Sequence, residues 1–420
     1  MAQTYFDLDK EHLINYYRFK PLKDGYLLTN DFGFWVYLSK GEFDLLRHYK
    51  ISSNLALMSL LKDKGFLITQ SNSEKLISDF GKRSRALFRG TYHHVIYLDG
   101  NNLNEEEIKE NIIKIVNFII QTRSREITIE FKGRVMEKFL VMKKFVDLFK
   151  TKTEKKIIYK IETNLLNASE NILEFLINNK FSVWAQIKDI TFTGDLFNSI
   201  KTLQRRLGIN FYLEVGSEIL NEGKKIIDFF ADNNLKSFFV RKTDEISKEE
   251  FVEFWKSALD YTHNINKKYR RIVFYEGFAS ILLNKILNIS DTFYPELNNF
   301  CAGAIVNDLA YTLDGNVYAN GESIGIELFN IGNVSSSYAS IVSNEDSLSL
   351  ISSSINYDTC LENNVFKPFI GNCPVCNYKE HGNIIPKYSS ERAWILTNML
   401  DYLFERILFE EDFLRFILPV

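Results

Sequence analysis

The feature that most restricts the fold is a regular alternation of short apolar and longer amphipathic segments between about residues 92 and 278. The apolar segments have the length and the β-branched and aromatic content of strands, and the amphipathic segments have the period of helices. Strands that alternate with helices form a parallel sheet. We therefore predict an α/β fold with a partial βα barrel over residues 90–290, and a doubly wound open sheet is the alternative. The strand segments are HHVIYL, EITIEF, KIIYKI, SVWAQIK, INFYLEV, KSFFVR and RRIVFYE.

Residues 1–75 predict a smaller unit of three strands followed by helices. The strand segments are YYRFK, GYLLTN and GFWVYLS, and the turn sequences KDG and DFG separate them. Ser39 is placed to cap the helix that begins at Lys40, and Gly65 is placed to end a second helix. This order of elements is similar to that of a winged-helix domain. The alternative is a small domain that only packs against the rest of the chain.

The third region, residues 295–420, differs in composition from the other two. It is rich in Asn, Ser and Gly, contains all the cysteines of the chain, and ends in the apolar helical sequence AWILTNMLDYLFERILFEEDFLRFIL. We treat it as a separate C-terminal domain.

The charge balance limits the classes of partner. With 51 basic and 54 acidic residues the net charge is −3, so no global attraction to nucleic acid or to an anionic membrane is expected. The basic clusters KKIIYK and NKKYRRIV are predicted to be solvated faces. The first residues show no secretory signal, no apolar run is long enough to span a membrane, and 4 cysteines are too few for a disulfide framework. We expect a cytoplasmic protein.

Several segments, taken in order, resemble one known family. They are YYRFKPLKDGYLLTNDFGFWVYLSKGEFDLL, EITIEFKGR, IETNLL, LAYTLDGNVYANGE, NIGNV, FKPFIGNCPVCNY and NMLDYLF. They are similar to radical SAM peptide maturases with a SPASM-type C-terminal domain, and most similar to the maturases of His-Xaa-Ser systems. The resemblance implies a βα barrel, S-adenosylmethionine, iron–sulfur clusters and a ribosomal peptide substrate.

The loop that would carry the catalytic cluster departs from the family pattern. The family places Cys-x3-Cys-x2-Cys after the first barrel strand, because iron–sulfur clusters require thiolate ligands. Here the loop runs from Asp99 to Asn104 without a cysteine, and the first cysteine of the chain is Cys301. Asn and Asp are hard oxygen ligands that do not replace thiolates. His93 and His94 are adjacent on a strand, point to opposite faces and cannot chelate together.

The second departure lies after the second barrel strand. The family has Gly-Gly-Glu-Pro there, and its Glu holds the amino group of SAM. This chain has Gly133-Arg134 instead. A guanidinium would repel the SAM ammonium, so the resemblance implies a degenerate member with no cofactor at the radical SAM site.

The C-terminal cysteine pattern is also incomplete. Cys301 matches the family, but Asn320 stands where a cysteine is expected after Gly315. In the next motif Cys360 and Cys373 match, whereas Asn363 and Phe369 (or Ile370) do not, and Cys373 with Cys376 forms a Cys-x2-Cys pair. One interpretation is a single zinc or iron–sulfur site formed by all the cysteines, and the other is inert thiols. The candidate metal ligands are Cys301, Cys360, Cys373 and Cys376.

The N-terminal unit resembles the peptide-recognition element of ribosomal-peptide maturases. Such modules bind a leader peptide as an added strand, so main-chain hydrogen bonds supply affinity and side-chain pockets supply specificity. The candidate edge runs from Phe34 to Ser39, with the helix from Lys40 as the other wall of the groove. The candidate peptide-binding residues are Phe34, Trp35, Val36, Tyr37, Leu38 and Ser39.

These observations predict a pseudo-enzyme with no catalytic residues. It would bind a ribosomal precursor peptide and a catalytic radical SAM protein as a heterodimer in peptide post-translational modification, and neither nucleic acid nor a membrane. One alternative is a metal-bearing electron-transfer or accessory protein. Another is an enzyme with a different barrel chemistry, since carboxylates at barrel strand ends can be catalytic. Its candidate acids are Glu130, Glu162, Glu214 and Glu276.

Overall fold

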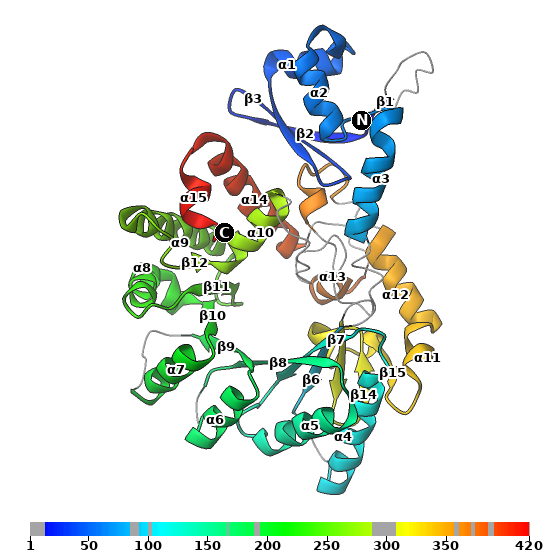
Figure 1. Ribbon diagram of the computed structural model, residues 1–420, viewed down its shortest axis with the longest axis vertical. Coiled ribbons are helices and arrows are strands. Elements are labelled where there is room, and N and C mark those ends of the chain that lie inside the picture. Colours follow the sequence, from blue (N-terminus) through cyan, green and yellow to red (C-terminus); the bar gives the residue numbers. More distant parts are fainter. Residues whose placement is uncertain are drawn as a thin grey trace. The chain divides into compact units, whose positions relative to one another are not determined.

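The computed structural model describes residues 13–84, 92–99, 103–165, 168–188, 194–287, 308–356, 361–370, 374–384 and 390–419. The chain forms two compact units, each built from segments that are far apart in sequence (Figure 1). Unit 1 contains Met1–Phe88, Leu282–Cys301 and Ile355–Glu405. Unit 2 contains Arg89–Ile281, Ala302–Ser354 and Arg406–Val420.

Unit 2 is organised around a ten-stranded sheet in the order β12-β11-β10-β9-β8-β7-β6-β13-β14-β15. Every pair from β12 to β13 is parallel, and the last two pairs are antiparallel. The predicted strand segments therefore form one parallel sheet. The strands are β6 (His93–Tyr97), β7 (Glu126–Lys132), β8 (Lys156–Thr163), β9 (Ser182–Ile187), β10 (Ile209–Val215), β11 (Ser237–Lys242), β12 (Tyr275–Glu276), β13 (Asp308–Thr312), β14 (Asn316–Tyr318) and β15 (Asn330–Asn333).

The helices that follow the parallel strands pack on one face of this sheet. Phe145 of α5 contacts Phe131 of β7, and Phe230 of α8 contacts Phe211 of β10. The register places Phe131 and Phe211 on the same face. A doubly wound sheet would carry helices on both faces, so a curled sheet of barrel type is favoured. The helices are α4 (Glu105–Ile120), α5 (Phe139–Lys152), α6 (Glu170–Asn178), α7 (Gly194–Arg206), α8 (Ser217–Asp232) and α9 (Lys248–Tyr269).

The C-terminal region extends the barrel sheet, which the sequence did not indicate. β13 lies parallel to β6, with Asp308 opposite His93 and Ala310 opposite Val95. The hairpin from β13 to β14 turns at Asp314-Gly315, as the DG sequence predicts. After β15 the chain continues into α11 (Tyr338–Val342) and α12 (Glu345–Asn356).

The last predicted barrel strand is shorter than expected. Only Tyr275 and Glu276 pair with β11. Asn266 of α9 accepts a hydrogen bond from the Val273 amide and donates one to the Phe274 carbonyl, so these groups are taken by a side chain. Asn266 also donates to the Phe416 carbonyl of α15 (Phe413–Ile417), which fastens the end of the chain to α9.

Unit 1 contains the three predicted N-terminal strands as an antiparallel sheet, β2 (Tyr17–Leu22), β3 (Gly25–Asn30) and β4 (Trp35–Ser39). Ser39 caps α1 (Lys40–Arg47), as predicted, and the structure adds a capping box with Glu42. The remaining elements are β1 (Leu13–Ile14), α2 (Leu55–Asp63), β5 (Leu67–Ile68), α3 (Gln70–Ser84), α10 (Gly277–Leu287), α13 (Pro374–His381) and α14 (Glu391–Phe409), of which α10 and α14 cross the division between the units.

The predicted C-terminal helix is divided into two helices: α14 ends at Phe409, and α15 begins at Phe413. Among the described residues, no helix is long and apolar enough to cross a membrane. The predicted division into domains at residues 1–75, 90–290 and 295–420 stays a prediction.

Candidate functional site

A surface ion pair occupies the C-terminal ends of β6 and β7, where the resemblance places the cofactor. Asp99 follows β6, and its Oδ1 accepts hydrogen bonds from the Arg134 backbone amide at 3.0 Å and from Arg134 Nε at 3.1 Å. Gly133 permits this approach, since it has a φ of +89° and a Cβ there would lie 3.0 Å from the carboxylate. Burial raises the pKa of Asp99, but the hydrogen bonds from Arg134 and Tyr97 outweigh it and lower the pKa.

The inner face of the curled sheet carries a network of charged side chains centred on Glu162. Its carboxylate accepts from Arg241 Nη1 at 2.5 Å and from Gln186 Nε2 at 2.7 Å, and Lys132 Nζ lies 3.9 Å away. Glu162 lies on β8 and Arg241 on β11, so the contact crosses two intervening strands. Strands are spaced by about 4.8 Å in a flat sheet, so such a contact is favoured by the curl.

The other charges of this face join the same network. Glu214 pairs with Lys188 at 3.3 Å and with Arg241 at 3.7 Å. Aromatic rings support the cations: Arg241 Cζ lies 4.2 Å from the Tyr212 ring centroid and Lys160 Nζ 4.8 Å from that of Trp184. Burial raises the pKa of Glu162, but Arg241, Lys132 and Gln186 outweigh burial and lower it. The carboxylate is therefore ionised and occupied by donors.

A histidine joins two carboxylates at the start of β6. His93 Nε2 lies 2.9 Å from Glu130 Oε2, and His93 Nδ1 lies 3.3 Å from Asp308 Oδ1. Glu130 also pairs with Lys160 at 3.1 Å. Burial lowers the pKa of His93, but Asp308 and Glu130 outweigh it and raise the pKa to about 9. The imidazolium thus links β13, from the C-terminal region, to barrel strand β7.

This geometry predicts a pH dependence of stability. The folded-state pKa of His93 is raised above its ordinary value of 6.5, so its contribution is complete below about pH 6.5 and is lost as pH rises through about 9. Urea unfolding between pH 6 and 9 should show wild type losing stability relative to His93→Gln, which cannot titrate. Parallel pH profiles for the two proteins would contradict the assignment of a charged His93.

The remaining candidate side chains lie in structural positions. His94 points to the opposite face from His93, as predicted, is fully buried and contacts the Tyr311 hydroxyl at 2.9 Å. Glu276 does not join the network around Glu162. It accepts from the Phe278 and Ala279 amides and from Trp255 Nε1, and so caps the start of α10. Of the candidate acids, the structure brings Glu130, Glu162 and Glu214 into one network.

Most of the predicted metal ligands lie outside the described residues, namely Cys301, Cys360 and Cys373. Cys376 is described, and its Sγ is 4.0 Å from Arg392 Nη1. No group of three or more His, Cys, Asp or Glu side chains in the described part of the chain could hold a metal ion. Asn320, at a family cysteine position, is buried beside a short helical turn, and its backbone amide donates to Ser323 Oγ.

The predicted peptide-binding residues form strand β4 and the residue before it, at the edge of the three-stranded sheet. Val36 and Leu38 point into the core of unit 1 with α1 and α2, whereas Trp35 packs on Phe404 and donates from Nε1 to the Ile286 carbonyl. Among the described strands, β3 is the neighbour of β4. Trp35, Val36 and Leu38 are therefore used in packing, and the Tyr37 hydroxyl donates to the Leu22 carbonyl.

The hairpin that joins β3 to β4 determines which residues of β4 direct their backbone groups toward β3. The Asn30 amide donates to the Phe34 carbonyl at 3.1 Å, and Leu28 then lies opposite Val36 and Leu27 opposite Tyr37. Opposite pairs alternate between hydrogen-bonded and non-hydrogen-bonded in an antiparallel sheet. The backbone groups of Val36 consequently face β3, and those of Tyr37 point away from it.

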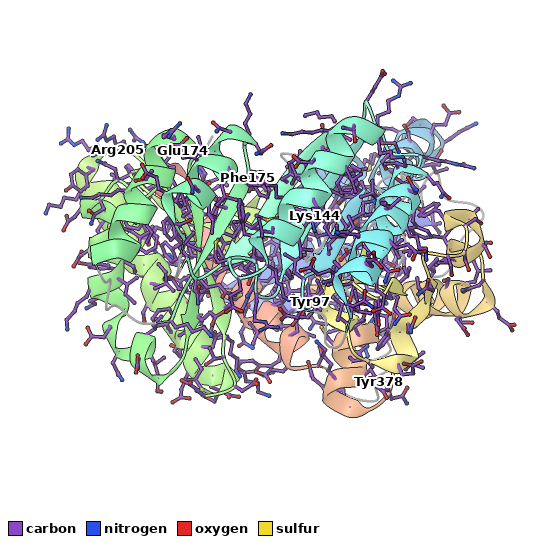
Figure 2. The ribbon with its side chains drawn as sticks, turned by 90° about the horizontal axis from the view of Figure 1, so that it is seen from below. Tyr97, Lys144, Glu174, Phe175, Arg205 and Tyr378 are labelled. Atoms are coloured by element: carbon purple, nitrogen blue, oxygen red, sulfur yellow. The ribbon has the colours of Figure 1, made fainter. Side chains whose placement is uncertain are left out.

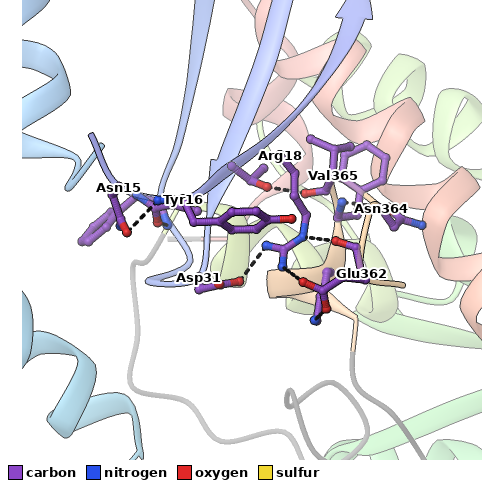
Figure 3. Close-up of polar contacts among 12 residues, drawn as sticks. Asn15, Tyr16, Arg18, Asp31, Glu362, Asn364 and Val365 are labelled. Atoms are coloured by element: carbon purple, nitrogen blue, oxygen red, sulfur yellow. Dashed lines mark hydrogen bonds and ion pairs between the residues drawn. The ribbon is translucent and has the colours of Figure 1, made fainter. Parts of the chain in front are cut away.

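The second face of this sheet contacts the segment that contains Glu362 and Val365, as Figure 3 shows. Arg18 of β2 is buried and donates from Nε to the Glu362 carbonyl at 2.6 Å and from Nη1 to Asp31 at 2.6 Å. Thr29 of β3 donates to the Val365 carbonyl at 2.5 Å. Side chains of unit 1 therefore contact both faces of this sheet.

Known proteins share this fold. No family model matches the chain, and no curated protein matches it in sequence. Solved structures do match. Native anSMEcpe with bound AdoMet and the Cp18Cys peptide superposes with a TM-score of 0.61 at 14% identity, covering 75% of this chain and 98% of that one. Native anSMEcpe with bound AdoMet gives 0.61 at 13%, with coverage of 75% and 98%.

A further match is Streptococcus suis SuiB bound to the precursor peptide SuiA. Its TM-score is 0.50 at 13% identity, with coverage of 89% of this chain and 97% of that one. The chain has the fold of these proteins. The resemblance drawn from the sequence motifs is thus confirmed at the level of the fold.

The sequence analysis missed the partners of the candidate acids. Lys132, Lys160, Arg241 and Asp308 were not singled out, although Lys132 and Lys160 each lie two residues from a glutamate on the same largely apolar strand. Charged residues at alternate positions of a buried strand are a signal for a polar inner face. The pairing of Arg241 with Glu162 carries no such local signal.

Proposed function

We propose that this chain is a non-catalytic subunit of a radical SAM peptide-modifying complex. The observation that carries the proposal is the ion pair between Asp99 and Arg134 at the C-terminal ends of β6 and β7. In the resembling family this position holds the amino group of S-adenosylmethionine. Here Arg134 presents a cation to that group, and its partner Asp99 is already engaged.

The donor set of this chain does not fit a catalytic iron–sulfur cluster. Three thiolates are needed after the first barrel strand, and the residues that follow β6 include none. On the inner face of the barrel Glu162 is held by Arg241, Gln186 and Lys132, which supports a structural role for this carboxylate. We therefore assign no reaction step and no S-adenosylmethionine to this chain.

Binding of a ribosomal precursor peptide is the activity that we assign to unit 1. Two of the similar structures carry peptides, one of them a precursor peptide. We place the leader segment along β4, whose Tyr37 backbone groups point away from β3. The other edge strand, β2, is less suitable. The two-residue turn after Leu22 makes Leu22 and Gly25 a hydrogen-bonded pair, so Pro21, which has no N–H, faces outward.

A non-catalytic peptide-binding chain needs a catalytic partner. We propose a cytoplasmic complex in which a radical SAM protein performs the chemistry and this chain presents the precursor. Enzyme families in which a non-catalytic member assists a catalytic one provide a precedent. This argument compares folds and does not compare functional sites.

The proposal predicts the outcome of a turnover assay. The chain alone, reconstituted anaerobically with iron and sulfide and then reduced with S-adenosylmethionine, should form no 5′-deoxyadenosine above a protein-free blank. The reason is the absence of thiolate donors after β6. A SAM-cleaving radical SAM protein prepared in parallel serves as the positive control. Formation of 5′-deoxyadenosine by this chain alone would overturn the pseudo-enzyme assignment.

A further inference from the structure

The turns that precede β7 to β11 are rich in lysine and arginine. They comprise residues 121–126, 150–156, 178–181, 204–208 and 232–236 and contain ten basic and three acidic residues. Parallel strands start at the same edge of a sheet, so these turns lie together at the N-terminal edge of the barrel sheet. We call these residues the basic edge. The local excess of positive charge contrasts with the net charge of −3 of the whole chain.

Much of this charge has no ion-pair partner among the residues that the structure describes. Lys156 pairs with Glu126, and Arg206 pairs with Glu174. Six other exposed side chains of the basic edge form no ion pair in the described part of the chain. They are Arg123, Arg125, Lys152, Lys180, Arg205 and Lys236. Exposed cations that do not pair internally remain available to an external anion.

The helix macrodipole explains only part of this pattern. Cations in the last turn of a helix offset its partial negative charge, and Lys150 and Lys152 end α5 as Arg205 and Arg206 end α7. The other basic residues of the basic edge lie after the helices, in the turns or at the first residue of a strand. Their accumulation at one edge is therefore not required by helix stability.

We propose that the basic edge is a docking surface for an acidic face of a partner protein. Among the described side chains, none of the exposed large hydrophobic residues lies on the basic edge. Binding of single-stranded nucleic acid commonly uses exposed aromatic rings for stacking, and interfacial membrane binding uses apolar residues that insert. An acidic protein surface needs neither, because charge complementarity steers and orients it.

The basic edge and the Asp99–Arg134 ion pair lie at opposite ends of the parallel strands. In Figure 2, Arg205 lies at the upper edge of unit 2, whereas Tyr97, at the C-terminal end of β6, lies well below it. A protein bound at the basic edge would not cover Asp99 and Arg134. The inference depends on the proposed function only in taking the partner to be a protein.

The test compares two triple variants with the same change in net charge. Arg125→Gln/Lys152→Gln/Lys180→Gln removes cations of the basic edge. Lys109→Gln/Lys143→Gln/Lys144→Gln removes exposed cations from α4 and α5 away from it. The probe is fluorescent poly-L-glutamate, titrated at about 0.05 M and about 0.3 M salt because screening weakens exposed charge pairs. Single-stranded DNA and phosphatidylserine vesicles are titrated at equal charge concentration.

We expect the basic-edge variant to bind poly-L-glutamate about five-fold more weakly than wild type at low salt, with little change in the control variant. Equal losses in both variants would overturn the proposal, as would tighter binding of wild type to DNA or to vesicles. If the triple variant unfolds, Arg123→Gln/Arg125→Gln tests the same edge from a single turn. The basic-edge variant should bind the precursor peptide as tightly as wild type does. This measurement distinguishes a failure of the docking proposal from a failure of the proposed peptide binding.

Discussion

Replacing Glu162 with alanine should destabilise unit 2 by about 1–3 kcal/mol, because Glu162 is buried whereas its partner Arg241 is 40% exposed and stays partly solvated after the change. The substitution leaves Arg241, Lys132 and Gln186 on the inner face without their shared acceptor. Because the chain has two units, global unfolding need not be two-state. Hydrogen exchange of β8 and β11, followed by mass spectrometry, reports the local loss of stability.

A matched control is available on the surface of the same unit. Glu137 pairs with Arg134 at 3.4 Å, and both side chains are more than half exposed. Glu137→Ala should therefore cost at most about 1 kcal/mol. Equal effects of the two substitutions would mean that the network around Glu162 does not stabilise the barrel.

The same measurement bears on the alternative that the barrel performs another chemistry. Catalytic groups are often held at a cost in stability, so their removal frequently stabilises a protein. A Glu162→Ala variant that is more stable than wild type would favour a reactive role for Glu162. A large loss of stability favours the view that Arg241 and Lys132 are permanent structural partners.

The strands and helix caps could be predicted because their signals are local. Apolar segments alternating with amphipathic segments predicted the parallel strands, and Ser39 predicted the start of α1. The shortening of β12 could not be predicted, because Val273 and Phe274 give their backbone groups to Asn266 of the preceding helix. The competing partner is a side chain, which the strand's own sequence does not reveal.

In the polar site, too, the contacts that depend on distant residues could not be predicted from the sequence. Glu130, Glu162 and Glu276 each lie at a strand position that suggests an exposed functional acid. Only the first two reach the inner network. Glu276 is followed at once by α10, and the Phe278 and Ala279 amides take its carboxylate as a cap. The addition of β13 to β6, which brings Asp308 to His93, joins segments more than 200 residues apart. Pairing over such a distance leaves no periodic trace in the sequence.

Replacing Tyr37 with proline should weaken binding of the proposed precursor peptide by about ten-fold or more. The Tyr37 backbone groups point away from β3, so an added peptide strand would accept from its amide. Proline removes that donor and its ring obstructs the ladder. One hydrogen bond is worth about 0.5–1.5 kcal/mol net, to which the steric cost of the ring is added, and about 1.4 kcal/mol corresponds to a ten-fold change.

Two controls separate the amide from the side chain and from folding. Tyr37→Ala removes the hydroxyl that donates to the Leu22 carbonyl but keeps the amide, so the ratio of the two affinities isolates the main-chain contact. Val36→Pro should instead damage the fold of unit 1, because the Val36 backbone groups face Leu28 of β3 and its side chain is in the core. Circular dichroism distinguishes the two proline variants. If Tyr37→Pro is well folded and binds the peptide as tightly as Tyr37→Ala does, the leader segment is not bound along β4.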